Sequence, residues 1–197
     1  MDFNNPIPQE WQSYVTQTAV NLEVVPSALY DTATYVDNVT QSLLFFNAVR
    51  ATQDLGNMQI ASMLPNPQSF LIQAIRLYAK YTDVVGTTVA SQLWNDLILL
   101  VNTGVLRLNI GEKKYGPWPL HWFPAGSAVN GMLAGANSNF MGYAQVQGDL
   151  YALAPYIMVA PLQNFFVELA WPAAAVDLTG NMVLSVEFDG QLARAVQ

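Results

Sequence analysis

Two glutamates are the residues of this chain best suited to acid–base chemistry. Glu168 and Glu187 each fall on the outward-looking face of a predicted strand, and a suitably spaced pair of carboxylates can hydrolyse glycosidic bonds. A solvated sheet face carries the same residues, and the sequence favours that simpler interpretation. Asp177 and Asp189 fall in expected turns, where aspartate bonds to the nearby backbone.

The chain has one histidine, His121, and no cysteine. A zinc site rich in histidine or thiolate is therefore excluded, and a carboxylate-only metal site would need clustered acids. A serine nucleophile would need His121 beside it, but no Gly-x-Ser-x-Gly turn is present, and Ser127 follows Pro-Ala-Gly in what reads as a structural turn. We expect His121 to be a packed residue that hydrogen-bonds to the backbone.

Binding motifs are also missing from the sequence. The glycine-bracketed segment 104–111 matches neither a phosphate-binding loop nor a dinucleotide fingerprint. Trp118, Trp122 and Phe123 could stack on sugars or bases, although aromatic residues beside prolines more often belong to a core or a contact. The sequence therefore assigns no catalytic residue, no cofactor-binding residue and no metal ligand, and we expect a protein that is not an enzyme and uses no cofactor.

Charge is scarce and does not cluster. Charged residues make up 11% of the chain, against about 25% in an average soluble domain, and the net charge is −7. Because nucleic-acid binding needs clustered cations, we expect no direct sequence-specific nucleic-acid binding. The seven basic residues are scattered except for one adjacent pair: Arg50, Arg76, Lys80, Arg107, Lys113, Lys114 and Arg194.

Amide side chains take the place of the missing charges. The chain has 15 Asn and 14 Gln, against 21 charged residues. Charged residues are depleted at the centres of protein interfaces, so this composition favours a chain whose surface is largely covered by neighbours. The alternative explanation of this composition is an ordinary domain that is thermally stable or secreted. No apolar run reaches the roughly 18 residues that span a bilayer, and we do not expect the first residues to form a signal peptide.

The elements that would position these residues are mostly short strands. Alternating or continuous apolar runs mark the strands, and Gly111-Glu112-Lys113 and Asp189-Gly190 are the expected hairpin turns. The segment 70–79 is open between strand and helix, and strand is favoured because Pro and Gly bracket it. The expected strands are 42–49, 58–63, 70–79, 105–110, 164–171, 181–188 and 192–196.

One helix is expected inside this series of strands. Val89, Leu93, Leu97 and Leu100 have helical spacing within residues 88–101, and a glycine follows the last turn. Residues 124–148, rich in small residues, predict a long loop on a surface or at a contact.

The N-terminal residues 1–35 predict an arm or packing segment, with only a loose helical spacing near Trp11, and residues 36–197 predict one domain. Seven or eight short strands with one inserted helix predict an all-β fold, an antiparallel sandwich or barrel.

Two segments of the chain resemble a known family. Residues 104–115 (Gly-Val-Leu-Arg-Leu-Asn-Ile-Gly-Glu-Lys-Lys-Tyr), followed by Pro119 and by Phe-Pro-Ala-Gly at 123–126, resemble a stretch of the single jelly-roll capsid proteins of tailless, often membrane-containing, icosahedral phages. The ending, residues 183–197, is similar to the last hairpin of such proteins. The resemblance covers about a third of the chain.

The resemblance implies a jelly-roll sandwich that self-assembles as the coat subunit of an icosahedral capsid and forms capsomers. Its partners would be copies of itself and other capsid proteins, or an internal viral membrane. Its location would be the virion, after assembly in the host cytoplasm. With so few basic residues, the chain differs from coat proteins that bind the genome through arginine-rich arms. The alternative is a carbohydrate- or ligand-binding β-sandwich module, such as a virion spike, decoration or receptor-binding protein, with Trp118 and Trp122 as its platform.

Overall fold

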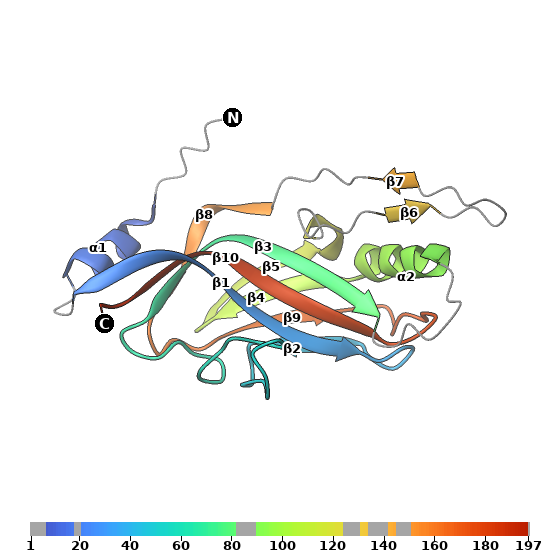
Figure 1. Ribbon diagram of the computed structural model, residues 1–197, viewed down its shortest axis with the longest axis horizontal. Helices are drawn as coiled ribbons and strands as arrows, with labels where there is room; N and C mark the ends of the chain where they lie inside the picture. The colour runs from blue at the N-terminus through green and yellow to red at the C-terminus, as the bar shows by residue number, and fades with distance from the viewer. Residues whose placement is uncertain are drawn as a thin grey trace.

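Eight strands of 4 to 14 residues, divided between two sheets, build the body of the described part of the chain in this computed structural model (Figure 1). The structure describes residues 7–17, 21–81, 90–123, 131–133, 142–144 and 151–196. In chain order the elements are α1 (Gln9–Gln17), β1 (Leu22–Tyr35), β2 (Ser42–Phe45), β3 (Ser69–Tyr81), α2 (Ala90–Thr103), β4 (Val105–Ile110), β5 (Lys113–Pro119), the 3₁₀-helix η1 (Leu120–Trp122), β6 (Gly131–Leu133), β7 (Gly142–Ala144), β8 (Tyr151–Val159), β9 (Phe165–Ala170) and β10 (Met182–Ala195).

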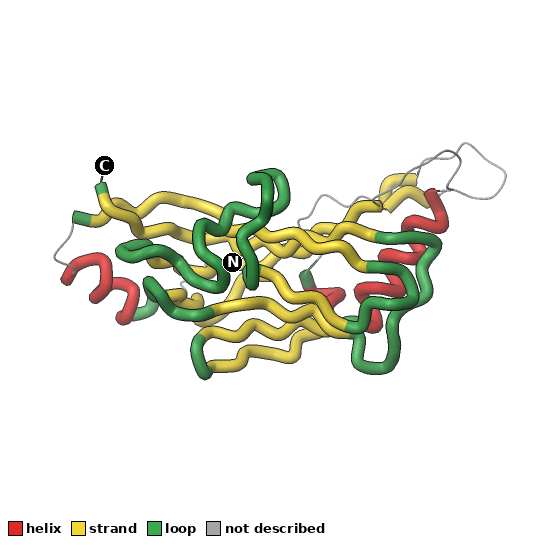
Figure 2. The backbone as a smooth tube through the Cα atoms, turned by 90° about the horizontal axis from the view of Figure 1, so that it is seen from below, coloured by secondary structure: helices red, strands yellow, loops and turns green. Residues whose placement is uncertain are grey.

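The order of the strands confirms the predicted jelly roll. One sheet has the order β1-β10-β3-β8 and the other β2-β9-β4-β5, with every neighbouring pair antiparallel. Apart from the β4–β5 hairpin, each connection between successive strands of these two sheets passes from one sheet to the other. That interleaving defines the jelly-roll sandwich. Figure 2 shows the two layers of strands, with helices at opposite ends.

Alternating sequence places the core between the layers. In β9 the side chains of Phe165, Val167 and Leu169 are fully buried, and in β10 those of Leu184, Val186 and Phe188 are, so each strand turns one face inward. Aromatic rings join the two sheets at the centre. The ring of Phe46 lies 4.7 Å from that of Phe188 and 5.6 Å from that of Phe165.

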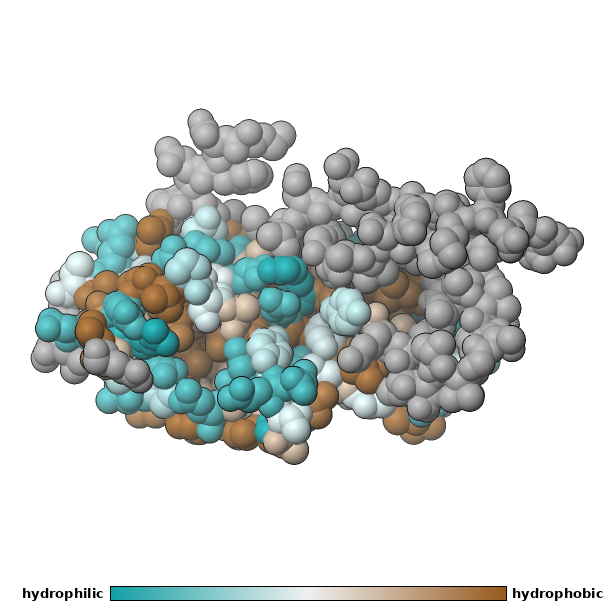
Figure 3. All heavy atoms as spheres, in the orientation of Figure 1, coloured by the Kyte–Doolittle hydropathy of each residue, from teal (hydrophilic) through white to brown (hydrophobic). Residues whose placement is uncertain are grey.

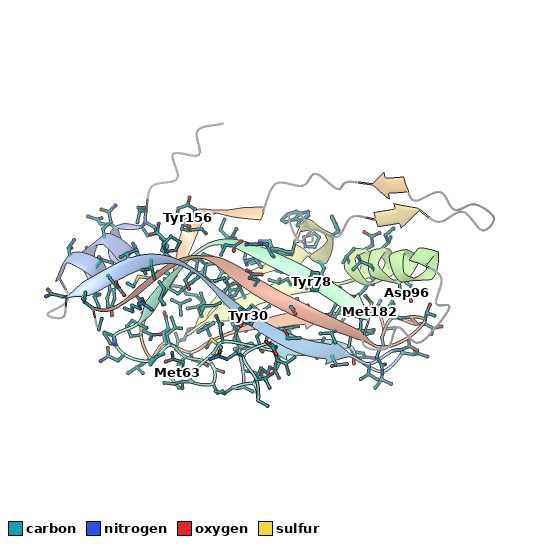
Figure 4. All side chains as sticks on the ribbon, viewed as in Figure 1. Tyr30, Met63, Tyr78, Asp96, Tyr156 and Met182 are labelled. Carbon is teal, nitrogen blue, oxygen red and sulfur yellow. The ribbon has the colours of Figure 1, made fainter. Side chains whose placement is uncertain are left out.

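The inserted helix is confirmed as α2, between β3 and β4. Gly104 follows it directly, and a Cβ there would lie 2.8 Å from side-chain atoms of both Leu120 and Trp171, which explains why glycine stands at this position. The indole of Trp171 donates a 3.0 Å hydrogen bond to the Leu100 carbonyl and so satisfies one of the open carbonyls of the last turn. Asp96, labelled in Figure 4, accepts a 2.7 Å hydrogen bond from the Thr179 amide and holds α2 against the β9–β10 connection.

The predicted boundary at residue 35 is wrong for residues 22–35. They form β1, an edge strand that pairs with β10 along its whole length, so the sandwich begins at Leu22. Ahead of it, α1 packs on the outer face of the first sheet through Trp11, which is 3% exposed and contacts Leu71 and Ala193. The Tyr14 hydroxyl adds a 2.6 Å hydrogen bond to the Pro67 carbonyl.

Two other predicted features are also wrong. Asp189-Gly190 is not a hairpin turn. β10 runs straight through it, with a bulge where the register against β3 shifts. Residues 58–63 form turns with a single isolated bridge between Ile60 and Met63, not a strand.

The predicted loop 124–148 contains two short strands, β6 and β7, which pair with each other. Its other residues lie outside the described part of the chain. β8, the second edge strand of the first sheet, is not among the strands predicted from the sequence.

Candidate assembly surfaces

The two glutamates considered for acid–base chemistry lie on opposite outer faces of the sandwich. Glu168 is on β9, and its Oε2 accepts a 3.0 Å hydrogen bond from Arg107 Nη1 on β4. Glu187 is on β10 in the other sheet, 3.7 Å from Arg76 Nη2 on β3. The core separates the two side chains, because each alternates with buried neighbours on its own strand. Each carboxylate is therefore half of a cross-strand ion pair, and the two cannot act on one bond.

The two aspartates have different surroundings. Asp189 accepts a 2.5 Å hydrogen bond from Arg76 Nε and a second bond from Nη2. The hydrogen bonds to Asp189 are the main reason that the pKa of Arg76 is raised. Asp177 is exposed in the β9–β10 connection. On the outer face of the first sheet, Arg76 thus lies between two carboxylates, those of Glu187 and Asp189.

His121 is exposed, so the expectation of a packed histidine is wrong. It lies in η1, and its neighbours Leu120 and Phe123 turn inward and are both fully buried. Trp118 packs against the core and meets Phe123 edge to face, with ring centroids 6.1 Å apart. Trp122, by contrast, is 40% exposed. The two tryptophans therefore face different surroundings and do not form one platform.

Ser127, which the sequence places in a structural turn, lies outside the described residues.

Most cations are neutralised inside the subunit. Arginines form ion pairs with Asp31, Asp189, Glu168 and Glu23, which accounts for all four arginines of the sequence. The side chain of Lys80 is not among those described. Lys113 and Lys114 are exposed at the start of β5 and form no ion pair with any described residue. Unpaired positive charge is thus concentrated at one turn of the described surface.

Asp31 is a fully buried carboxylate that the sequence analysis did not single out. Its Oδ1 accepts hydrogen bonds from Arg50 Nε at 2.5 Å and from the Thr32 amide at 2.8 Å. Its Oδ2 accepts from the Phe46 amide at 2.5 Å and from Arg50 Nη2 at 2.8 Å. The hydrogen bonds to Asp31 are the main reason that the pKa of Arg50 is raised. This cluster ties the start of the β2–β3 connection to β1.

Asn57 makes a second attachment between the same two segments. Its side-chain oxygen accepts a 2.9 Å hydrogen bond from the Tyr30 amide, and its side-chain nitrogen donates a 2.8 Å bond to the Ala28 carbonyl. The Asn57 amide also donates to the Tyr30 carbonyl at 3.2 Å. These bonds satisfy backbone groups on the free edge of β1, which would otherwise be open to pairing with another chain.

Apolar side chains are exposed along this side of the sandwich, which we call the β1–β2 rim (residues 36–60). Figure 2 looks at this side, and Figure 3 shows hydrophobic atoms along the lower margin, where Figure 1 places β2 and the connection to β3. Met63, labelled in Figure 4, lies just beyond the rim at the same margin. Of the fourteen large apolar side chains exposed in the described residues, six belong to the rim: Val36, Val39, Leu44, Val49, Leu55 and Ile60.

Within the described residues, no group of three or more acidic or histidine side chains could hold a metal ion, and none of the described helices has the length and apolar character needed to cross a membrane. No family model, curated protein or solved structure matches the chain. The described residues thus form three surfaces that could contact another molecule. They are the rim with its exposed apolar side chains, the turn with two lysines, and the outer sheet faces with their ion pairs.

Proposed function

We propose that this chain is a structural virion protein, a self-assembling coat subunit that forms the capsomers of an icosahedral capsid, and that it is not an enzyme. The observation that carries the proposal is the combination of a jelly-roll strand order with a low content of charged residues, 11% of the chain. Jelly rolls occur in viral capsids and in lectins. The fold is therefore an argument by analogy, and the surface chemistry favours one use over the other.

The surface chemistry favours burial against other proteins. Burying an isolated charge is costly, whereas an amide can donate and accept hydrogen bonds with whatever lies opposite. The chain has 29 amides, from 15 Asn and 14 Gln, against 21 charged residues, and its four arginines are already neutralised by acids of the same subunit. Covering such a surface with a neighbouring protein therefore costs little desolvation free energy.

In a closed shell, each individual contact between subunits can be weak. Symmetry repeats every interface around the particle, so contacts of about 1,600 Å² or less can together hold many copies. We propose copies of this chain and other capsid proteins as the partners, or an internal viral membrane. The location is the virion, after assembly in the host cytoplasm. Direct sequence-specific binding to nucleic acid is not expected, because clustered cations are needed for it.

Negative-stain electron microscopy of the purified full chain tests the proposal. Rings or shells of uniform diameter are the expected result. Fields that contain only separate particles of the size of one 21.7 kDa subunit, at protein concentrations where coat proteins assemble, would contradict it.

A carbohydrate- or ligand-binding module is the second candidate, and the exposure of Trp122 favours it. Exposed tryptophan faces stack well on sugar rings. A glycan array distinguishes the candidates: binding that is lost on Trp122→Ala would support the module, and an array without signal would remove it.

A further inference from the structure

We propose that neighbouring copies pack edge to edge, with the β1–β2 rim of one copy against the β5 edge of the next. The contact is then heterologous, meaning that two different surfaces meet, rather than two-fold symmetric. This inference rests on the proposed function and specifies which surfaces of the coat subunit make its lateral contact.

The rim has the composition of an interface. Residues 36–68, which comprise the rim and the rest of the connection to β3, include only three charged residues among 33, together with eight amides. Of those three, Arg50 is neutralised by Asp31. Asp54 is exposed, and Asp37 accepts a 2.6 Å hydrogen bond from the Leu178 amide but pairs with no described cation. The rim is therefore apolar and amide-rich, with negative charge only.

The opposite edge of the second sheet has the complementary charge. β2 and β5 are its two edge strands, and β5 begins with the exposed Lys113 and Lys114. Glu112 is exposed on the same turn, so the two lysines leave a net charge of +1 there. Trp122, which follows β5 in η1, adds exposed aromatic surface.

Neither β1 nor β5 is suited to forming a continuous sheet with a neighbour. Asn57 occupies backbone groups of β1, and Pro117 and Pro119 deprive β5 of two backbone donors. The contact must therefore be made by side chains, whose charges then decide which surfaces can meet.

Charge favours the heterologous arrangement over the symmetric ones. A rim packed on a second rim would bring two negatively charged surfaces together, and a β5 edge packed on another would bring together two turns that are each net positive. Like charges in contact suppress an association, and opposite charges favour it. A rim packed on a β5 edge brings the two signs together, and a heterologous contact of this kind closes into a ring when its rotation allows.

Charge reversal tests the arrangement. Asp54→Lys alone, and Lys113→Glu with Lys114→Glu, should each raise the concentration needed for half-assembly about tenfold at low salt, as measured by light scattering. The triple variant that combines all three changes should assemble at a lower concentration than either separate variant, because the new cation of the rim then faces the new anions of the β5 edge. An equal mixture of the two separate variants should also assemble. Glu10→Lys, an equal charge change on α1, is the matched control and should have no effect.

The outcomes separate this inference from the proposed function. A wild-type chain that never assembles contradicts the coat-subunit proposal itself. A wild type that assembles, with reversal variants that assemble equally well, overturns only the edge-to-edge contact. A triple variant that assembles no better than the two separate variants would also overturn the edge-to-edge contact, because its reversed charges would then not meet. Circular dichroism of each variant checks that the exposed substitutions leave the fold intact.

Discussion

The carboxylate of Asp31 on β1 and the guanidinium of Arg50 in the β2–β3 connection form a bidentate ion pair. Arg50 Nε donates to Oδ1 at 2.5 Å and Nη2 donates to Oδ2 at 2.8 Å. The Asp31 side chain is 1% exposed and that of Arg50 is 24% exposed. The pair holds the first part of the β1–β2 rim against the edge of the first sheet. The surface that we assign to assembly is therefore shaped by a buried contact within the subunit.

Asp31→Asn should lower the free energy of unfolding by roughly 2–3 kcal/mol, because the amide cannot accept all four hydrogen bonds and leaves Arg50 without its counter-ion. Denaturant titration measures the change. Arg107→Gln is the matched control, since it breaks the partly exposed pair with Glu168 and should cost less than about 1 kcal/mol. Equal effects of the two changes would contradict the structural role given to Asp31.

Gly190→Ala should destabilise the sandwich by about 3 kcal/mol or prevent folding, because overpacking forces the backbone to move. A Cβ at Gly190 would lie 1.9 Å from the Leu71 carbonyl oxygen on β3. Thermal unfolding followed by circular dichroism measures the loss. Gly111→Ala is the comparison: its φ is +56° and the nearest atom would be 3.4 Å away, so it should cost only about 1–2 kcal/mol. A mild effect of Gly190→Ala would mean that the bulge is placed wrongly.

The elements that could be predicted from the sequence are those in which the spacing of apolar residues matches the face that is buried in the fold. β4 has apolar residues at every second position because one of its faces is buried. β9 is a short apolar run whose alternate side chains are buried, and α2 has its own helical spacing. β1 was missed because its outer residues and Pro26 obscure the alternation, and the pairing with β10 that stabilises it is distant in sequence. β8 was missed because Pro155 and small residues weaken the strand signal.

The surface features depend even more on tertiary contacts. A sequence gives no sign that Asp31 is fully buried or that its partner is Arg50, because both facts arise from how the β2–β3 connection crosses β1. Asp189-Gly190 has the composition of a hairpin turn, yet neighbouring strands on both sides of β10 keep it extended as a bulge. The scarcity of charge, in contrast, could be read directly from the sequence.

Trp11→Ala should release α1 from the sheet without opening the core. Trp11 packs in a small cluster with Leu71 and Ala193, and that cluster lies on the outer face of the first sheet, apart from the main core. Hydrogen exchange should therefore lose protection in residues 9–17 and keep it in β3 and β10. Phe188→Ala is the contrasting variant. It should lower the free energy of unfolding by about 3–5 kcal/mol and so reduce protection throughout the chain. Global loss of protection in the Trp11 variant would contradict this separation.

Stability should fall as the pH rises above 10. Burial raises the pKa of the Tyr35 hydroxyl above its ordinary value of 10.0, the hydrogen bond at Val176 lowers it, and the charge of Asp37 raises it. The folded chain then keeps a proton that the unfolded chain has already released, so the free energy of unfolding decreases with increasing pH. Melting temperatures between pH 8 and pH 11 should show a steeper fall for the wild type than for Tyr35→Phe. Parallel curves would contradict a role for this proton.

Sedimentation velocity of the full chain over a wide range of concentration, at low and at high salt, tests the central claim most directly. If the chain is a coat subunit whose charge-poor surface is covered by neighbours, the boundary should shift with concentration to discrete, fast-sedimenting assemblies many times larger than 21.7 kDa. A single slow boundary with the mass of one subunit, unchanged at every concentration and salt, would contradict the account.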